Sequence, residues 1–303
     1  MCPFTMKDYA TLHREHCLAV PPTFNFGRDV VEAWAGNADK TALIWCDGTG
    51  SERSFTFSDV AQRSNQVANW LTERGIRKGE RIIVMLPRIP EWQIALVGCL
   101  KVGVVPIPCI TMLTEKDVSY RVRHSGAVGA ITMIAEVHKF EACGASFKAR
   151  LAIGGSGAGW HDYKDVGALA AKFDACELEA EEPAIIYYTS GSTGNPKGVE
   201  LTHGNWNFEV QAADFAFLFD QGERYVSWLP LAHVFGQLID NHYWVDKAMH
   251  MYVADNPLNV VDLAKEVQPH LFIGVPRIYE KIYSNVKAAI DGKAVLRVGL
   301  KLP

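Results

Sequence analysis

A loop rich in glycine, hydroxyl and amino groups follows an apolar run near the middle of the sequence. Between Thr189 and Gly198 it contains three glycines, four serine or threonine hydroxyls and one lysine, Lys197. Glycine lets the backbone approach a ligand closely, so that successive N–H groups can point at phosphate oxygens. Hydroxyls add donors or a metal ligand, and the lysine adds positive charge. We interpret the loop as a nucleotide phosphate-binding loop, the alternative being a solvated turn with an incidental lysine.

The loop differs from the Walker pattern of P-loop NTPases. That pattern requires glycine directly before the lysine and serine or threonine directly after it. Here Pro196 precedes Lys197, and Gly198 follows it. Because proline donates no N–H and disfavours a helical conformation at Asn195, the lysine is predicted in a hairpin-like loop and not at a helix start. The pattern argues against a kinase or GTPase of the P-loop type.

The composition excludes several classes of protein. The 303 residues are 49% hydrophobic and 21% charged, with a net charge of −4, so nucleic acid is not expected as a partner. Seven cysteines lack the spacing of a zinc site or a disulfide framework, which suits a reducing cytoplasm. Residues 1–20 lack the apolar core of a signal peptide. The apolar stretch 94–113 contains Lys101 and two prolines, so a helix followed by a strand is favoured over a membrane span.

Short strands and helices alternate along the chain. Strands are predicted at 41–46, 55–57, 81–86, 104–108, 129–134, 225–229, 249–253 and 271–273. Helices are predicted at 29–34, from the cap at Ser58 to Gly75, and at 91–101, 115–124, 205–219, 236–245, 259–267 and 276–289. Residues 1–27 are a lead-in, residues 141–166 are the least structured part, and a subdomain boundary falls at about 175–183. This alternation indicates an α/β fold with a doubly wound parallel sheet.

Three segments together resemble the adenylate-forming (AMP-binding) superfamily of acyl-CoA synthetases, luciferases and peptide-synthetase adenylation domains. Thr-Ser-Gly-Ser-Thr-Gly-x-Pro-Lys-Gly at 189–198 resembles its signature loop. Residues 229–237 resemble the segment beside the acyl substrate, and 272–281 are similar to the Val-Pro-Arg-x-x-Glu-Lys segment of long-chain acyl-CoA synthetases. Residues 87–92 and 101–106 are most like medium-chain or acetate-type enzymes. The resemblance covers roughly residues 28–290.

The resemblance implies ATP, Mg²⁺ and coenzyme A as ligands and a fatty acid as substrate. A carboxylate attacks the α-phosphate of ATP, and the coenzyme A thiol then attacks the resulting acyl-adenylate. Thr189 corresponds to the family's hydroxyl that helps to hold Mg²⁺. The residues expected to bind the ATP phosphates are Thr189, Ser190, Gly191, Ser192, Thr193, Gly194 and Lys197.

The acyl side of the site is expected at two of the matched segments. By resemblance, His233 is the candidate catalytic residue, His233 and Phe235 lie at the acyl entrance, and Gly274 lies along the acyl pocket. Alternatives stay open: His233 as a packed histidine bonded to the backbone, and Gly274 as a glycine needed only for backbone geometry. His203, which matches another family position, is as well explained by a structural role as by a catalytic one.

The family's fold is the expected one: an N-terminal domain of two mostly parallel sheets with flanking helices, αβαβα-like, here residues 28–303 and incomplete at the C-terminus. The segment with the second magnesium ligand and the C-terminal lysine domain cannot be placed in this sequence. We therefore expect a fatty acid–CoA ligase, long-chain by its second half, with little activity in this chain alone. The alternatives are a medium-chain synthetase or other carboxylate adenylator, and a non-catalytic protein that binds acyl or nucleotide ligands. A cytoplasmic location is expected, with peripheral membrane contact left open.

Overall fold

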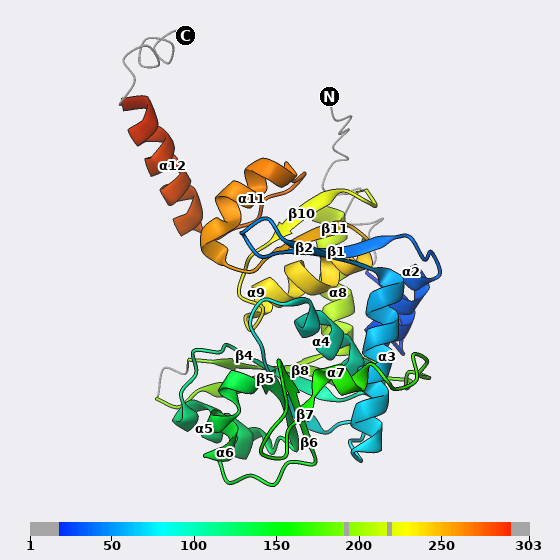
Figure 1. The fold of residues 1–303 in the computed structure, drawn as a ribbon. Helices are drawn as coiled ribbons and strands as arrows, with labels where there is room; N and C mark the ends of the chain where they lie inside the picture. The colour runs from blue at the N-terminus through cyan, green and yellow to red at the C-terminus, as the bar shows by residue number, and fades with distance from the viewer. Residues whose placement is uncertain (1–17, 191–193, 217–219, 292–303) are drawn as a thin grey trace.

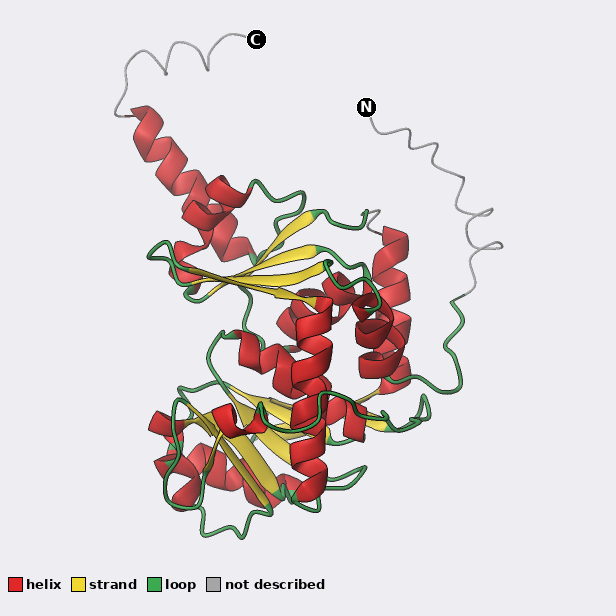
Figure 2. Cartoon of the chain, turned by 45° about the vertical axis from the view of Figure 1, so that its right-hand side comes forward, coloured by secondary structure: helices red, strands yellow, loops and turns green. Residues whose placement is uncertain are grey.

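Two β-sheets lie one above the other with helices between them (Figures 1 and 2). The structure is a computed structural model, and it describes residues 18–190, 194–216 and 220–291. Three of the residues predicted to bind phosphate, Gly191, Ser192 and Thr193, therefore lie outside the described residues.

The lower sheet of Figure 1 has five strands, all parallel. In spatial order they are β4 (Val105–Cys109), β3 (Arg81–Met85), β5 (Gly129–Met133), β6 (Ala149–Ile153) and β7 (His161–Asp162). Along β3, Ile82 and Val84 belong to the core between the two sheets, which we call the inner core. Ile83 and Met85 belong to the core on the opposite face, the outer core. The apolar run at 81–86 is thus buried on both faces, as predicted.

Helices cover both faces of this sheet. On the inner face, α3 (Phe57–Glu73) packs against α4 (Pro90–Val102), and both contribute to the inner core. On the outer face, α5 (Glu115–Ser125) and α6 (His138–Glu141) contribute Val118, Val122 and Phe140 to the outer core. The short helix α7 (Tyr163–Val166) follows β7.

The upper sheet has four strands, in the order β10 (Arg224–Ser227), β11 (His250–Ala254), β1 (Thr41–Cys46) and β2 (Glu52–Thr56). Only the pair β1–β2 is antiparallel. The outer face of the upper sheet is covered by α11 (Val260–Val267), which is preceded by the short η4 (Pro257–Asn259). The five resulting layers, α–β–α–β–α, confirm the predicted fold class.

Several helices fill the space between the sheets, and another helix stands apart from them. The first group comprises η1 (Gly27–Glu32), α2 (Ala33–Ala35), α8 (His203–Ala216), α9 (Val234–Gln237), η3 (Leu238–Tyr243) and α10 (Trp244–Asp246). Helix α12 (Pro276–Asp291) projects away from the upper sheet in Figure 1. Tyr283 on this helix is 67% exposed, so part of its apolar face meets solvent.

An antiparallel hairpin carries the predicted phosphate loop. Strand β8 (Pro183–Thr189) pairs with β9 (Lys197–Thr202), and β8 lies beside β4 at the edge of the five-stranded sheet. Successive residues of β8 point alternately into the two cores. Ile185 and Tyr187 pack in the inner core, and Ile186 and Tyr188 pack in the outer core. The hairpin-like loop predicted from Pro196 is confirmed, although the second strand was not predicted.

The structure corrects three further details. Residues 141–166 contain strand β6, which is paired with β5 along its whole length although its local pattern is weak. The cap of α3 is Thr56, not Ser58, because the Thr56 hydroxyl accepts from the Asp59 N–H while Asp59 accepts from Thr56 in return. The strand predicted at 271–273 makes only one bridge, from Leu271 to Tyr225.

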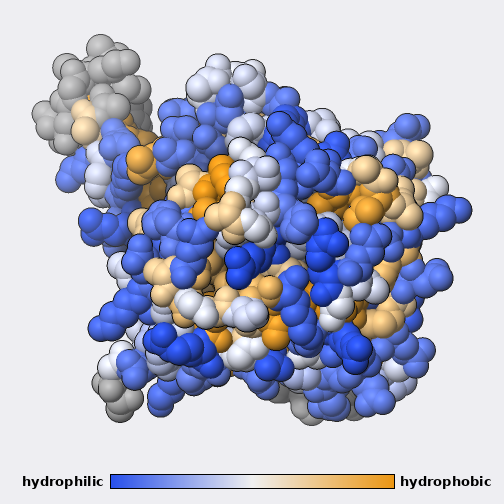
Figure 3. All heavy atoms as spheres, turned by 60° about the horizontal axis from the view of Figure 1, so that its bottom comes forward, coloured by the Kyte–Doolittle hydropathy of each residue, from blue (hydrophilic) through white to orange (hydrophobic). Residues whose placement is uncertain are grey.

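The surface is polar with interrupted apolar areas. Figure 3 shows, on the face seen there, apolar patches separated by charged and polar groups. Within the described part of the chain, no helix has both the length and the apolar character needed to cross a bilayer.

One buried arginine joins the two sheets. Arg88 follows β3 and is 9% exposed. Its Nε donates to the Ala254 carbonyl at 2.8 Å, and its Nη2 donates to Ser227 Oγ at 2.6 Å. Its Nη1 donates to the Leu229 carbonyl, and its own carbonyl accepts from Trp45 Nε1 at 2.8 Å. Arg88 therefore ties the end of β3 to the carboxyl ends of β10 and β11, and through Trp45 to β1.

We expect Arg88→Met to lower the free energy of unfolding by about 3 kcal/mol, because it strands buried acceptors that lose charge-assisted bonds. Arg88→Lys should recover only part of this loss, since one ammonium cannot span three separated acceptors. Urea unfolding followed by tryptophan fluorescence measures both variants. Arg123→Met, on the exposed side of α5, is the matched control. Equal stability of Arg88→Met and the control would contradict the assigned role.

Candidate functional site

Thr189 and Lys197 face each other at the mouth of the β8–β9 hairpin. They are directly paired in the antiparallel register, and both are exposed. Directly opposed residues of an antiparallel pair project to the same face, with Cβ atoms about 5 Å apart. Thr189 follows the alternation of Ile185 and Tyr187, so this face is the one turned to the inner core. The expected metal-binding hydroxyl and the expected phosphate-binding cation therefore lie side by side.

The described part of the loop is open to solvent. Ser190, Gly194 and Asn195 are exposed. Gly194 has φ +113°, a conformation that L side chains rarely adopt, and a Cβ added there would meet nothing within 4 Å. With the Thr189 hydroxyl as an oxygen ligand of the kind that Mg²⁺ prefers, this set fits a magnesium-bound polyphosphate.

His233 lies at the start of the short helix α9. Its Nδ1 accepts a hydrogen bond from the Phe235 N–H at 3.3 Å, and its carbonyl accepts from the Gln237 N–H at 2.9 Å. Since Nδ1 is the acceptor, the neutral ring carries its proton on Nε2. Both His233 and Phe235 are exposed. The histidine thus combines the two interpretations made from the sequence: a backbone contact at one nitrogen and a donor available at the other.

Gly274 packs against aromatic and aliphatic side chains. A Cβ added to it would lie 2.5 Å from Ile278 Cγ2 and 3.0 Å from Trp228 Cζ2. Trp228 is 8% exposed, stacks on Phe272 with ring planes 7° apart, and donates from Nε1 to the Ile273 carbonyl at 2.7 Å. The lack of a side chain at Gly274 is therefore required by the packing of Trp228 and Ile278.

The structure brings the two segments that were expected on the acyl side together at one edge of the upper sheet. Trp228 directly follows β10, in the segment that leads to His233, and it contacts the segment that contains Gly274. The hairpin with Thr189 and Lys197 belongs to the lower half of the molecule, next to β4. Arg88 lies within the matched segment 87–92 and Trp228 within the predicted strand 225–229, but the sequence assigned a role to neither. The contacts of Arg88 and the packing of Trp228 on Phe272 join distant segments, so no local pattern would have identified either residue.

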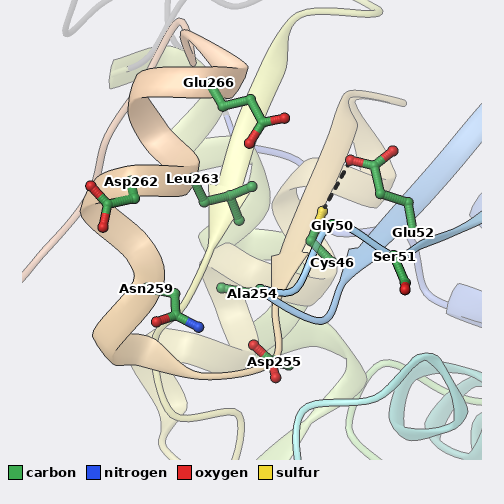
Figure 4. A pocket seen from close by; sticks show the side chains of 11 residues that line it. Cys46, Gly50, Ser51, Glu52, Ala254, Asp255, Asn259, Asp262, Leu263 and Glu266 are labelled. Atoms are coloured by element: carbon green, nitrogen blue, oxygen red, sulfur yellow. Dashed lines mark hydrogen bonds between the residues drawn. The ribbon is translucent and has the colours of Figure 1, made fainter.

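A separate cavity of about 210 Å³ lies at the carboxyl ends of β1 and β11 (Figure 4). Four carboxylates line it, from Glu52, Asp255, Asp262 and Glu266. The thiol of Cys46 lies 3.7 Å from Glu52 Oε1, and burial, aided by that carboxylate, raises the pKa of this thiol to about 12. Such a negative lining repels phosphate, so this cavity is distinct from the expected nucleotide site.

Comparison with known proteins identifies the family. The chain matches the AMP-binding enzyme family over residues 30–300. It belongs to that family. It is 33% identical over 222 residues to an uncharacterized acyl-CoA ligase, YtcI, of Bacillus subtilis, covering 73% of this chain and 41% of the relative. It is 32% identical over 247 residues to the human mitochondrial acyl-coenzyme A synthetase ACSM5, covering 78% of this chain and 41% of that enzyme.

Solved structures share the fold at low identity. An acyl-CoA synthetase from Brucella canis superposes with a TM-score of 0.74 at 19% identity, covering 86% of this chain and 49% of that one. The o-succinylbenzoate coenzyme A synthetase of Bacillus subtilis, in complex with AMP, gives a TM-score of 0.69 at 20% identity, covering 84% and 63%. This chain thus spans about two fifths of the length of the curated relatives that it matches.

Two histidines in the helices between the two sheets are buried. His203 begins α8 and His242 lies in η3, each 1% exposed, and the His242 ring lies 3.7 Å from that of Trp206. Burial lowers the pKa of His203 to about 4, against a smaller opposing effect of Glu182. Burial lowers the pKa of His242 to about 3, with a weaker opposing bond to the Gln237 carbonyl. Both rings are neutral near pH 7, and the enclosed position of His203 favours its structural interpretation.

The lowered pKa values of His203 and His242 predict that the folded protein loses stability in acid. As pH falls below 6.5, the unfolded chain binds protons before the folded chain, so stability is full above pH 6.5 and falls toward pH 4. The loss for His203 alone should reach about 3 kcal/mol by pH 4. The slope of the unfolding free energy against pH gives the number of protons taken up on unfolding. His203→Gln should lower this number by about one. The exposed His138→Gln is the control, and an unchanged slope in His203→Gln would contradict the assignment.

Proposed function

We propose that this chain forms the phosphate- and acyl-binding part of an AMP-forming acid–CoA ligase. The observation that carries the proposal is the pairing of Thr189 with Lys197 on one face of an open glycine-containing hairpin. In the proposed reaction a carboxylate attacks the α-phosphate of ATP, pyrophosphate leaves, and the thiol of coenzyme A displaces AMP from the acyl-adenylate. Lys197 would neutralise charge on the departing phosphates, a contribution that depends on preorganised position.

Two further groups have roles in this proposal. The Thr189 hydroxyl would be one ligand of Mg²⁺, which would offset the charge of the phosphates when bound. The Nε2–H of His233, oriented by the bond at Nδ1, would donate to the carboxylate of the acid at the acyl entrance. Ser190 and Gly194 would contact the β- and γ-phosphates, together with Gly191, Ser192 and Thr193.

The length of the acyl group is the finer part of the proposal. The segment at 272–281 favours a long-chain acid by resemblance. The packing of Trp228 and Ile278 against Gly274 instead favours a shorter acid, because these side chains occupy the space that a long tail beside Gly274 would need. Trp228 is held by its bond to Ile273 and by Phe272, so we propose it as the side chain that limits the tail.

The first test is binding of MgATP to the 303-residue chain by isothermal titration calorimetry. Lys197→Ala should weaken binding about tenfold or more, because a charge-assisted bond to phosphate is lost. Lys265→Ala, which removes an equally exposed lysine paired with Asp262 on α11, should bind as the unmodified chain does. Equal affinity in both variants would overturn the phosphate-binding proposal.

ATP–pyrophosphate exchange with octanoate and palmitate, run on the same samples, separates the two functional interpretations. Binding of MgATP without exchange supports a non-catalytic nucleotide-binding chain. Exchange that depends on the added acid supports a ligase that acts within these residues.

The second test concerns the acyl tail. Trp228→Ala should strengthen binding of palmitate relative to octanoate, by about fourfold for each additional methylene buried in the space released. Calorimetric titration of both acids into the two proteins measures the ratio. Tyr283→Ala, at an exposed position of α12, controls for the loss of an aromatic side chain. If the ratio of palmitate to octanoate affinity is unchanged in Trp228→Ala, Trp228 is not the side chain that limits the length of the acyl tail.

A further inference from the structure

Helix α5 lies behind the phosphate-binding hairpin and contacts it through aromatic side chains. The hydroxyl of Tyr120 donates to the Pro196 carbonyl at 2.9 Å. The Tyr188 hydroxyl and His124 Nδ1 share a hydrogen bond of 2.8 Å. Tyr120 and His124 are four residues apart, hence on one face of α5, and their rings stack with centroids 5.3 Å apart. The helix therefore bonds to the hairpin at two points, one in β8 and one just before β9.

The two points of contact lie on the opposite side of the hairpin from the ligand-binding groups. Tyr188 alternates with Tyr187 and Thr189, and it packs on the outer core together with α5. Gly198, paired with Tyr188, carries no side chain that would compete with this ring for the space. Thr189 and Lys197 project to the other face. Contacts from α5 can therefore hold the loop without obstructing a bound phosphate.

Helix α5 is rigid enough to serve as an anchor. Its first turn is closed by a reciprocal capping box between Thr114 and Asp117, whose bonds lower the pKa of the Asp117 carboxyl. Val118 and Val122 fix it to the sheet. The guanidinium of Arg121 lies 5.2 Å from the Tyr188 ring, which adds a cation–π contact.

We propose that Tyr120 and His124 are positioning residues that set the geometry of the phosphate loop from behind. This rests on the proposed function of the loop. The bond from Tyr120 fixes the peptide plane between Pro196 and Lys197, the residue whose ammonium is expected to meet the phosphates. The bond from His124 fixes Tyr188, next to Thr189. Preorganisation of both sides of the hairpin mouth lowers the ordering cost of ligand binding.

Tyr120→Phe tests the proposal in the intact 303-residue chain because it removes only the hydroxyl. Without ligand, amide hydrogen exchange at Gly194, Asn195, Lys197 and Gly198 should become about three- to tenfold faster. The affinity for MgATP should fall by a similar factor, while the thermal unfolding midpoint stays that of the unmodified chain. Tyr283→Phe, the same deletion at an exposed tyrosine, is the matched control and should change none of these.

A second pair of variants tests the His124 contact. His124→Phe and Tyr188→Phe should each accelerate exchange at Thr189 and Ser190. The double variant should equal Tyr188→Phe, because removal of the Tyr188 hydroxyl already removes its bond to His124. Additive effects of the two substitutions on exchange would contradict the proposal that the hydrogen bond between His124 and Tyr188 holds this side of the loop.

The outcomes separate this proposal from the function on which it rests. If the unmodified chain fails to bind MgATP but exchange accelerates in Tyr120→Phe, the anchor stands and the phosphate-binding function fails. If the unmodified chain binds MgATP and Tyr120→Phe changes neither exchange nor affinity, the anchor is overturned. Faster exchange with unchanged affinity also overturns it, because the contact would then have no effect on the ligand. A lowered unfolding midpoint with the same ligand affinity points to a structural role and overturns it as well.

Discussion

The buried guanidinium of Arg88 is the interaction on which the relative placement of the two sheets depends. The acceptors that it meets lie at the ends of β10 and β11 in the upper sheet, whereas the arginine itself follows β3 of the lower one. Removing a guanidinium from water is costly unless its donors are matched by acceptors. Its fixed fork satisfies several strand-end groups at once, and those ends are where open α/β sheets bind ligands. One side chain thus holds the end of β3 in the lower sheet next to the ends of β10 and β11 in the upper sheet.

The hairpin illustrates a second constraint, the alternation of side chains along a strand. Residues 185–188 alternate between the two cores and the exposed Thr189 continues the alternation, which fixes which groups face the proposed ligand and which face α5. Because a shift of one residue in the pairing would exchange the two faces, the packing of Tyr188 on the outer core also determines where Thr189 and Lys197 point. The binding geometry therefore follows from core packing more than from the loop itself.

Buried polar groups recur at the joints between segments. Lys101 is fully buried, and its ammonium donates to Glu32 Oε1 at 2.5 Å and to Asn65 Oδ1 at 2.6 Å, which links η1, α3 and α4. Burial lowers the pKa of this lysine, while the bond to Glu32 opposes that effect. Such networks are costly when incomplete, so they specify one arrangement of the helices around them.

Local sequence was sufficient for much of the fold. The apolar runs, the cap at Thr114 and the proline at the start of α4 defined most elements, since these signals act over a few residues. The residues of the phosphate loop were also readable locally, because glycine, hydroxyl and lysine chemistry is carried by the side chains themselves. Strand β6 and the single bridge at Leu271 could not be predicted from local sequence, since pairing with distant strands decides whether such segments form strands.

By itself, then, the sequence determined the family, the α/β class and the chemical character of the loop at 189–198. Only the tertiary structure decided that Thr189 and Lys197 share a face, that Trp228 fills the space beside Gly274, and that Tyr120 and His124 hold the loop from behind. The physical reason is the separation along the chain. Tyr120 lies 76 residues from Pro196, and contacts of that range are set by how the sheets and helices pack, not by any local pattern.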